Sequence, residues 1–220
     1  MMGRMQLEKE VQIPADAVQL AGSLVLPEHA VGLVAFAHGS GSSRFSPRNT
    51  FVARQLNQAG IATLLMDLLT EEEDRRYETR FDIDLLTDRL LQATYWLQKQ
   101  PATKDLEIGY FGASTGAAAA LKAAAALPSS VRAVVSRGGR PDLADEALAK
   151  VQSPTLLIVG GNDPVVLQLN RNAFEQLPGE KDLIIVPGAT HLFEEPGTLE
   201  EVARLATGWF RSHLHSVPVA

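Results

Sequence analysis

The chain has 220 residues, a formal net charge of −6, 45% hydrophobic residues and no cysteine. This length suits one large α/β domain, and the balance of apolar and charged residues is ordinary for a soluble globular protein. The negative charge disfavours nucleic acid as a partner, and the absence of cysteine excludes disulfides, thiolate nucleophiles and Cys-based metal sites.

Short β-rich runs alternate with helical patterns, which favours an α/β fold built on a mostly parallel sheet. Residues 8–27 alternate apolar and polar side chains and predict two strands paired as a hairpin. The apolar runs at 32–39 and 61–69 predict buried strands. Between them, residues 46–60 predict a helix with Ser46 as its N-cap.

The middle of the chain contains a stretch rich in charged residues, at 70–84. We interpret it as a solvated loop, with an acidic rim of a binding site as the alternative. A helix is predicted directly after it, at 85–100, where apolar residues recur at helical spacing.

The remaining elements continue the alternation of strand and helix. An alanine-rich run after the strand at 106–112 predicts a helix that lies close to the sheet. No repeat or linker divides the chain, so we expect residues 1–220 to form a single domain. The other predicted strands are 131–136, 154–161 and 182–188, and the other predicted helices are 143–151, 166–177 and 198–214.

The strand at 106–112 runs into the motif G-A-S-T-G, which has Ser114 at its centre. A serine between a strand and a helix is the setting of a nucleophile elbow, in which a strained turn exposes the hydroxyl. Gly112 and Gly116 supply the small neighbours that such a turn needs, and the following helix N-terminus favours an anion there. The alternative is a small-residue packing contact between helix and sheet.

A serine nucleophile needs a base, and the base needs an acid that orients it. Asp163 follows the strand at 154–161, and His191 follows the strand at 182–188. The carboxyl ends of parallel strands form the edge where such sheets bind ligands. The order serine, acid, histidine therefore predicts a triad of Ser114, Asp163 and His191. Asp163 would also suit a turn, and His191 a surface or capping position.

The loop after the strand at 32–39 begins with His38 in the motif H-G-S-G. A glycine-rich turn here is expected to supply an oxyanion donor, so we predict the backbone N–H groups of Ser40 and Thr115 as the oxyanion hole. His38 itself is interpreted as a structural residue that braces the loop. The loop lacks the third glycine of a dinucleotide-binding motif, and no G-K-[ST] motif occurs.

Two arginines, Arg137 and Arg140, flank glycines after the strand at 131–136, on the same edge of the predicted sheet. Guanidinium groups bind carboxylates, so both are candidate substrate-binding residues. The alternative is a solubilising loop or an internal salt bridge.

The motifs H-G-S-G-S-S, G-A-S-T-G, G-N-D-P and G-A-T-H follow one another in the order of an α/β-hydrolase, which the chain resembles over nearly its whole length. It is most similar to the small, single-domain dienelactone hydrolase-like proteins. This resemblance implies an eight-stranded, mostly parallel sheet with helices on both faces, and it implies no cofactor. Dienelactone hydrolases proper use a cysteine nucleophile, so its absence favours a serine esterase that forms an acyl-enzyme on Ser114.

The connection between the strands at 131–136 and 154–161 is too short for the helical lid that many α/β-hydrolases carry there. We therefore expect a shallow, open site that prefers short-chain esters or small lactones. Amidases, peptidases and acyltransferases share this machinery and remain alternatives. A non-catalytic ligand receptor with the same fold is the alternative from another class.

No segment approaches the ~18 consecutive apolar residues of a membrane span. The N-terminal residues 1–14 lack the apolar core of a signal peptide. We expect a cytoplasmic monomer or homodimer that binds a small-molecule ester or lactone, with neither nucleic acid nor a membrane as partner.

Overall fold

Residues 6–215 are described here from a computed structural model, and a central eight-stranded sheet organises them. The strands are β1 (Gln6–Ala15), β2 (Val18–Pro27), β3 (Leu33–Ala37), β4 (Ala62–Met66), β5 (Ile108–Ala113), β6 (Val131–Arg137), β7 (Thr155–Gly160) and β8 (Lys181–Val186). Their order across the sheet is β1-β2-β4-β3-β5-β6-β7-β8. Strand β2 is antiparallel to β1 and to β4, and every other neighbouring pair is parallel. The predicted hairpin and the mostly parallel eight-stranded sheet are thus confirmed.

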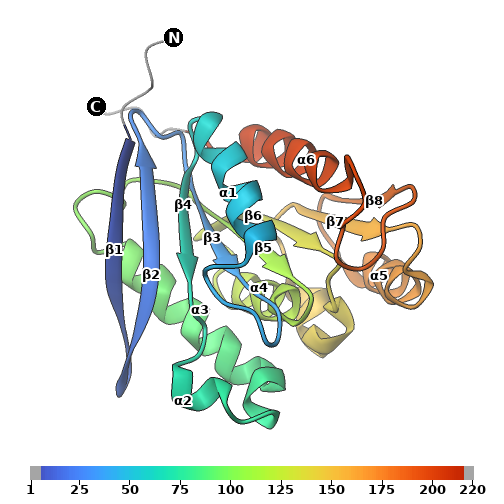
Figure 1. The fold of residues 1–220 in the computed structure, drawn as a ribbon, viewed down its shortest axis with the longest axis horizontal. Helices are drawn as coiled ribbons and strands as arrows, with labels where there is room; N and C mark the ends of the chain where they lie inside the picture. Colours follow the sequence, from blue (N-terminus) through green and yellow to red (C-terminus); the bar gives the residue numbers. More distant parts are fainter. Residues whose placement is uncertain (1–5, 216–220) are drawn as a thin grey trace.

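Helices cover both faces of this sheet, as Figure 1 shows. The helices are α1 (Pro47–Gln58), α2 (Glu71–Asp74), α3 (Ile83–Leu97), α4 (Thr115–Ala126), α5 (Pro164–Gln176) and α6 (Thr198–His213), with 3₁₀ helices η1 (Glu78–Phe81) and η2 (Pro141–Lys150). Helices α1 and α6 share one apolar core with their face of the sheet, which includes Val52, Phe111 and Phe210. Helices α3, α4 and α5 share the core of the opposite face, which includes Leu90, Tyr110 and Leu157.

Helix α4 lies close to the sheet, as its alanine content predicts. The side chains of Ala117, Ala118, Ala119 and Ala120 are all fully buried. Because these side chains are small, the helix backbone can approach β5 closely, and the N-terminus of α4 is held at the end of that strand.

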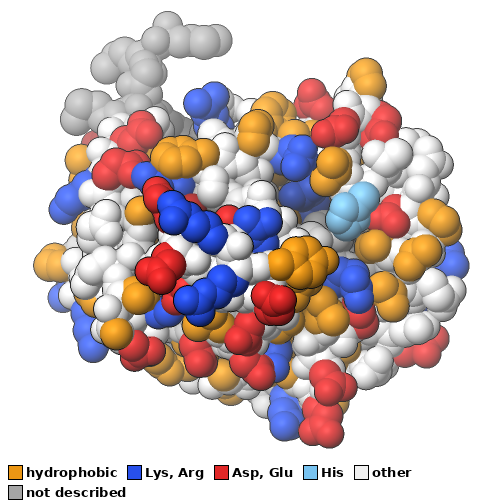
Figure 2. Space-filling view, turned by 60° about the horizontal axis from the view of Figure 1, so that its bottom comes forward, with side chains coloured by type: hydrophobic (Ala, Val, Ile, Leu, Met, Phe, Trp, Pro, Cys, Tyr) orange, Lys and Arg blue, Asp and Glu red, His pale blue; other side chains and the backbone are white. Residues whose placement is uncertain are grey.

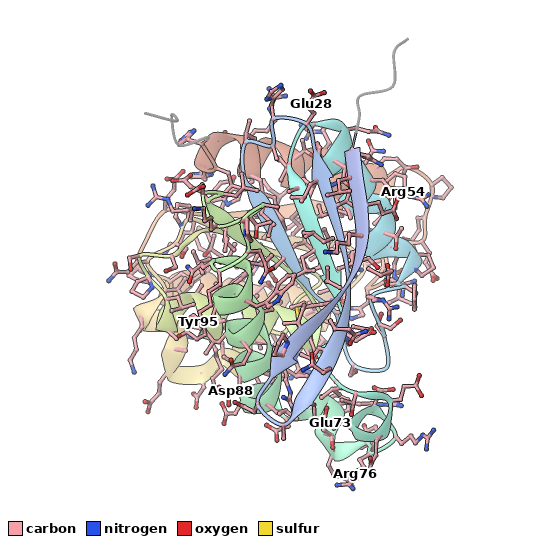
Figure 3. The ribbon with its side chains drawn as sticks, turned by 90° about the vertical axis from the view of Figure 1, so that its left-hand side faces the viewer. Glu28, Arg54, Glu73, Arg76, Asp88 and Tyr95 are labelled. Atoms are coloured by element: carbon pink, nitrogen blue, oxygen red, sulfur yellow. The ribbon has the colours of Figure 1, made fainter. Side chains whose placement is uncertain are left out.

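The charged stretch at 70–84 is largely exposed to solvent, as predicted, but it is not a loop, and that part of the interpretation was wrong. It forms α2 and η1, because Thr70 and Glu73 make a reciprocal capping box at the start of α2. Glu73 also forms an ion pair with Arg89 of α3, at 2.8 Å. Figure 3 shows α2 beside the tip of the β1–β2 hairpin, with Arg76 pointing away from the body of the protein. Arg89 also donates a 2.8 Å hydrogen bond to the Ala15 carbonyl oxygen at the end of β1, so it connects α2 and the hairpin to α3.

The connection between β6 and β7 contains η2 and no lid domain, as predicted. The sequence predicted an ordinary helix at 143–151, whereas this segment is a kinked 3₁₀ helix with Asp145 at φ 48° and ψ −133°. Within residues 6–215, none of the helices combines the length and the apolar character needed to cross a bilayer. Because the β6–β7 connection contains no lid domain, the carboxyl ends of the parallel strands are left open at one edge of the sheet.

Candidate active site

Ser114 occupies a strained turn between β5 and α4. Its backbone has φ 51° and ψ −123°, a conformation that residues with a side chain rarely adopt. A Cβ atom at Gly112 would lie 2.4 Å from Ala117 Cα, and one at Gly116 would lie 2.2 Å from the Ala37 carbonyl oxygen. Only glycine fits at these two positions, so the G-x-S-x-G pattern is a steric requirement of this turn.

Asp163 and His191 come from the loops after β7 and β8 and meet at the same edge. His191 Nδ1 lies 2.7 Å from Asp163 Oδ2. Because an ionised carboxylate only accepts hydrogen bonds, the imidazole donates from Nδ1 and leaves Nε2 available. Asp163 is also the N-cap of α5, and its Oδ1 accepts a 3.4 Å hydrogen bond from the Val166 N–H. The helix cap thus fixes the carboxylate that orients the histidine.

Ser114 and His191 line one cavity of about 260 Å³. Within the described residues no hydrogen bond joins the Ser114 hydroxyl to His191. The structure relates the two residues through the cavity that both of them line. Hydrogen bonds of this kind are often long in ligand-free sites and shorten when a substrate binds. All three residues of the predicted triad therefore come to one edge of the sheet.

The two predicted oxyanion donors lie next to each other and next to Ser114. The Ser40 N–H donates a 2.9 Å hydrogen bond to Thr115 Oγ1, which the sequence did not predict. The loop packs tightly here, since a Cβ atom at Gly39 would lie 3.0 Å from Ser114 Cβ. The Ser40 N–H is therefore already hydrogen-bonded to a side-chain hydroxyl.

His38 lies in the same loop, and its side chain is buried, with 6% of the residue exposed. Its Nε2 accepts a 3.0 Å hydrogen bond from the Leu68 N–H, and its Nδ1 lies 2.9 Å from the Gly39 carbonyl oxygen. Burial lowers the pKa of His38, which favours the neutral ring that these two contacts require. These contacts support the predicted bracing role.

The two candidate arginines have different surroundings. Arg137 lines the cavity beside Ser114 and is buried, whereas Arg140 is not among the lining residues. The Arg140 guanidinium donates to both carboxylate oxygens of Asp142, at 2.9 and 2.8 Å. Of the two arginines, only Arg137 thus lines the cavity that Ser114 lines, and Arg140 forms the internal salt bridge that was its alternative.

Sequence reasoning missed the contribution of the α1 helix to this cavity. The first turn of α1 faces the same edge as Ser114, and its N-cap is Ser46, as predicted. A usable signal was present, because a helix that starts directly after the H-G-S-G loop must begin at that edge. The cavity-lining residues that were not predicted include Ser42, Ser46, Arg48 and Asn49.

Comparison with known proteins supports this architecture. A family model described as the dienelactone hydrolase family matches residues 24–212. The crystal structure of a dienelactone hydrolase from Anabaena variabilis is 57% identical, has a TM-score of 0.93, and the match covers 96% of this chain and 99% of that one. An α/β serine hydrolase without a lid, from Xanthomonas campestris, shares the fold at 24% identity, with a TM-score of 0.77 over 96% of this chain and 97% of that one.

The curated relatives carry a different name. Proteins named putative phosphoribosyl transferases, from two strains of Mycobacterium tuberculosis, are each 61% identical over 207 residues, which is 94% of this chain and 47% of theirs. The chain spans about half the length of the curated relatives it matches, so their name describes proteins with a large region outside the match. The family model and the similarity to the Anabaena enzyme nevertheless agree over most of this chain, which therefore belongs to the dienelactone hydrolase family.

Proposed function

We propose that this protein is a serine hydrolase that cleaves small esters or lactones through an acyl-enzyme on Ser114. The observation that carries the proposal is the strained Ser114 in a cavity shared with a histidine that is bonded to a carboxylate. A serine, a base and an orienting acid are the parts that acyl transfer requires.

In the proposed mechanism, His191 Nε2 takes the hydroxyl proton as Ser114 Oγ attacks the ester carbonyl carbon. Asp163 holds the Nδ1–H and stabilises the imidazolium that forms. The imidazolium then gives its proton to the departing alkoxide, which leaves as the alcohol. Water, losing a proton to His191, then attacks the acyl-enzyme carbonyl carbon. The bond from that carbon to Ser114 Oγ breaks, the imidazolium returns the proton to Oγ, and the carboxylic acid product leaves.

The negative charge of the tetrahedral intermediate is stabilised by the backbone N–H groups of Ser40 and Thr115. Thr115 begins α4, so its N–H is at the positive end of that helix. The oxyanion takes the place of Thr115 Oγ1 as acceptor of the Ser40 N–H. Thr115 Oγ1 thus accepts the hydrogen bond from the Ser40 N–H until charge develops on the substrate, and the oxyanion then displaces it.

Phosphoribosyl transfer is the alternative that the name of the mycobacterial relatives raises. That reaction is a displacement at a sugar carbon, and it would give the strained serine and its neighbouring histidine–carboxylate pair no role. More than half of each relative lies outside the match, so the name is weaker support than the residues of this site.

The site favours small substrates. Its cavity measures about 260 Å³, and the β6–β7 connection contains only η2, with no lid to enclose a long acyl chain. Each added methylene should therefore gain little of the ~0.8 kcal/mol that full burial provides. With p-nitrophenyl esters, kcat/KM should be highest between acetate and butyrate and lower for octanoate. A steady rise to palmitate would contradict this description of the site.

The proposal is tested by covalent labelling with a fluorophosphonate probe. The unmodified protein should be labelled and should hydrolyse p-nitrophenyl acetate, and Ser114→Ala should do neither. Ser42→Ala is the matched control, because Ser42 lines the same cavity. Equal labelling of the protein and of Ser114→Ala would refute the acyl-enzyme mechanism, and an unlabelled protein without turnover would favour a ligand receptor.

A further inference from the structure

We propose that the cavity beside Ser114 contains an anion-binding subsite, separate from the oxyanion hole and formed by Arg137, Arg48 and the N-terminal turn of α1. This subsite holds an anionic group on the non-reacting part of the substrate. The group is a phosphate in preference to a carboxylate. The identity of this ligand as part of an ester rests on the proposed function, whereas the subsite itself rests on the arginines and on the helix.

Arg137 is a buried cation without a counter-charge in the protein. Only 6% of the residue is exposed, its Nε has no hydrogen-bond partner, and its Nη2 donates a long 3.4 Å hydrogen bond to Asn49 Oδ1. Between residues 6 and 215, the structure shows no ion pair that includes this guanidinium. The guanidinium also lies over the ring of Phe193, whose centroid is 5.8 Å from Cζ. Burying a charge is unfavourable unless the charge is paired.

The guanidinium is nevertheless charged at neutral pH. Burial, together with the nearby positive charge of Arg48, lowers the pKa of Arg137 to about 10. The guanidinium of Arg137 therefore stays protonated although its burial disfavours the charge. An anion can reach it from the cavity that Arg137 lines. An unpaired cation of this kind is explained when a ligand supplies the missing negative charge.

Arg48 adds a second guanidinium to the same cavity. Its Nε is also buried without a hydrogen-bond partner. Its Nη1 lies 3.3 Å from a carboxylate oxygen of Glu194, whose side chain is 64% exposed, so this ion pair is weakened by solvent. Arg48 belongs to the first turn of the twelve-residue helix α1, whose N-terminus attracts anions. Pro47 has no N–H and the Asn49 N–H is capped by Ser46 Oγ, so in this first turn the Arg48 N–H is the backbone donor left for an anion. Two cations and a helix N-terminus thus face one small cavity.

Other arginines at this end of the molecule are paired. Arg44, which lines a neighbouring cavity, lies 2.7 Å from Asp67 and 3.1 Å from Glu10. Arg140 is paired with Asp142. Figure 2 brings this end of the molecule forward and shows acidic and basic side chains interspersed over it. The missing partner of Arg137 is therefore a property of this one cavity and not of the surface around it.

The number of donors favours phosphate. A carboxylate has two oxygens and is matched by a single guanidinium, whereas a phosphate monoester has three terminal oxygens and close to two negative charges. Two guanidinium groups beside a helix N-terminus match the larger charge and the larger number of acceptors. Because the subsite and Ser114 line the same cavity, the anionic group and the ester carbonyl must be separated by only a short linker.

Binding is tested in Ser114→Ala, which cannot turn over, by thermal unfolding with inorganic phosphate at constant ionic strength. Phosphate should raise the unfolding temperature more than acetate or succinate does, and Arg137→Met in this background should abolish the rise. Arg140→Gln is the matched control and should keep it. Without phosphate, Arg137→Met should unfold at a higher temperature than its parent, because an unpaired buried charge has been removed.

Selectivity is tested with two esters of similar size, the anionic mono-p-nitrophenyl succinate and the neutral p-nitrophenyl valerate. Arg137→Met should lower kcat/KM for the anionic ester at least about tenfold, the loss of one charged hydrogen-bonded contact, and leave the neutral ester within about threefold. Arg48→Gln should also lower kcat/KM for the anionic ester relative to kcat/KM for the neutral ester. If Arg137→Met does not fold, Arg48→Gln provides the test.

The outcomes separate the subsite from the proposed function. If the protein hydrolyses neither ester but phosphate still stabilises Ser114→Ala through Arg137, the esterase proposal fails and the subsite stands. Equal losses for both esters, together with no stabilisation by phosphate, would show that Arg137 is only structural. Stronger stabilisation by carboxylates than by phosphate would overturn the preference for phosphate.

Discussion

His38 and His191 both lie just beyond the carboxyl end of a strand in the central sheet, yet their surroundings differ. His38 is buried, and both of its ring nitrogens contact the backbone, at the Leu68 N–H and the Gly39 carbonyl oxygen. His191 is partly exposed, and its Nδ1 is hydrogen-bonded to Asp163, which leaves Nε2 available for a substrate. Position in the fold makes either histidine a candidate base, and the contacts of the second nitrogen favour His191 in the proposed mechanism.

The largest expected effect is on the His191 side of this comparison. His191→Ala should lower kcat for p-nitrophenyl acetate by about 10⁴-fold or more, similar to Ser114→Ala, because residues of a triad act as one unit. His38→Ala should keep kcat/KM within about tenfold, since in the proposed mechanism His38 neither gives nor takes the proton. Steady-state kinetics and circular dichroism on the three variants check this. Equal rates in His191→Ala and the unmodified protein would remove His191 as the base.

A somewhat smaller loss is expected when the partner of His191 is changed. Asp163→Asn should reduce kcat by about 10³- to 10⁴-fold, because an amide can donate to Nδ1 and so favour the wrong tautomer. The same substitution keeps an oxygen that can accept from the Val166 N–H, so α5 should remain capped and the unfolding temperature should change little. A large drop in stability with an unchanged rate would reverse this assignment and make Asp163 only a cap.

The elements of the sheet could be predicted because each is a local pattern. The apolar strands, the alanine-rich helix and the G-A-S-T-G turn are short signals that depend on nearby residues alone. The capping box at Thr70 and Glu73 is also local, and reading T-x-x-E as a helix start would have avoided the error at 70–84. Local signals thus account for most of the fold, including the segment that was misinterpreted.

The remaining features of the site arise from contacts between distant segments. The hydrogen bond from the Ser40 N–H to Thr115 joins residues 75 positions apart. Arg137 and Arg140 are equivalent in sequence context, and only the packing of α1 and Phe193 around Arg137 makes it a buried cation. Such differences depend on tertiary packing, which neither periodicity nor composition encodes.

The His38 side of the comparison predicts an effect on stability. His38→Ala removes the acceptor of the Leu68 N–H and the donor to the Gly39 carbonyl, so a buried backbone N–H loses its partner. We expect the free energy of unfolding to fall by about 1–3 kcal/mol, measured by urea denaturation. His191→Ala, which loses a partly exposed contact, should change the stability by less. The opposite ranking would show that His38 is not a bracing residue.

The smallest expected effect is a difference in pH dependence. Burial lowers the pKa of His38 in the folded protein below the ordinary value of 6.5, against the opposing influence of the Asp67 and Asp74 charges. Between those two pKa values the unfolded chain binds more protons than the folded one, so acid favours unfolding. The contribution of neutral His38 is therefore complete above about pH 6.5 and is lost as the pH falls below it, with a slope of at most ~1.4 kcal/mol per pH unit.

This difference is measured as the free energy of unfolding from pH 8 to pH 5 in the unmodified protein and in His38→Gln, which cannot be protonated. All other histidines are common to both proteins, so subtracting the two curves isolates His38. The stability of the unmodified protein should fall more steeply with acid than that of His38→Gln. His29→Gln is the control, because the His29 side chain is 92% exposed and should leave the slope unchanged. Parallel curves for the unmodified protein and His38→Gln would mean that His38 is protonated as easily in the folded protein as in the unfolded chain.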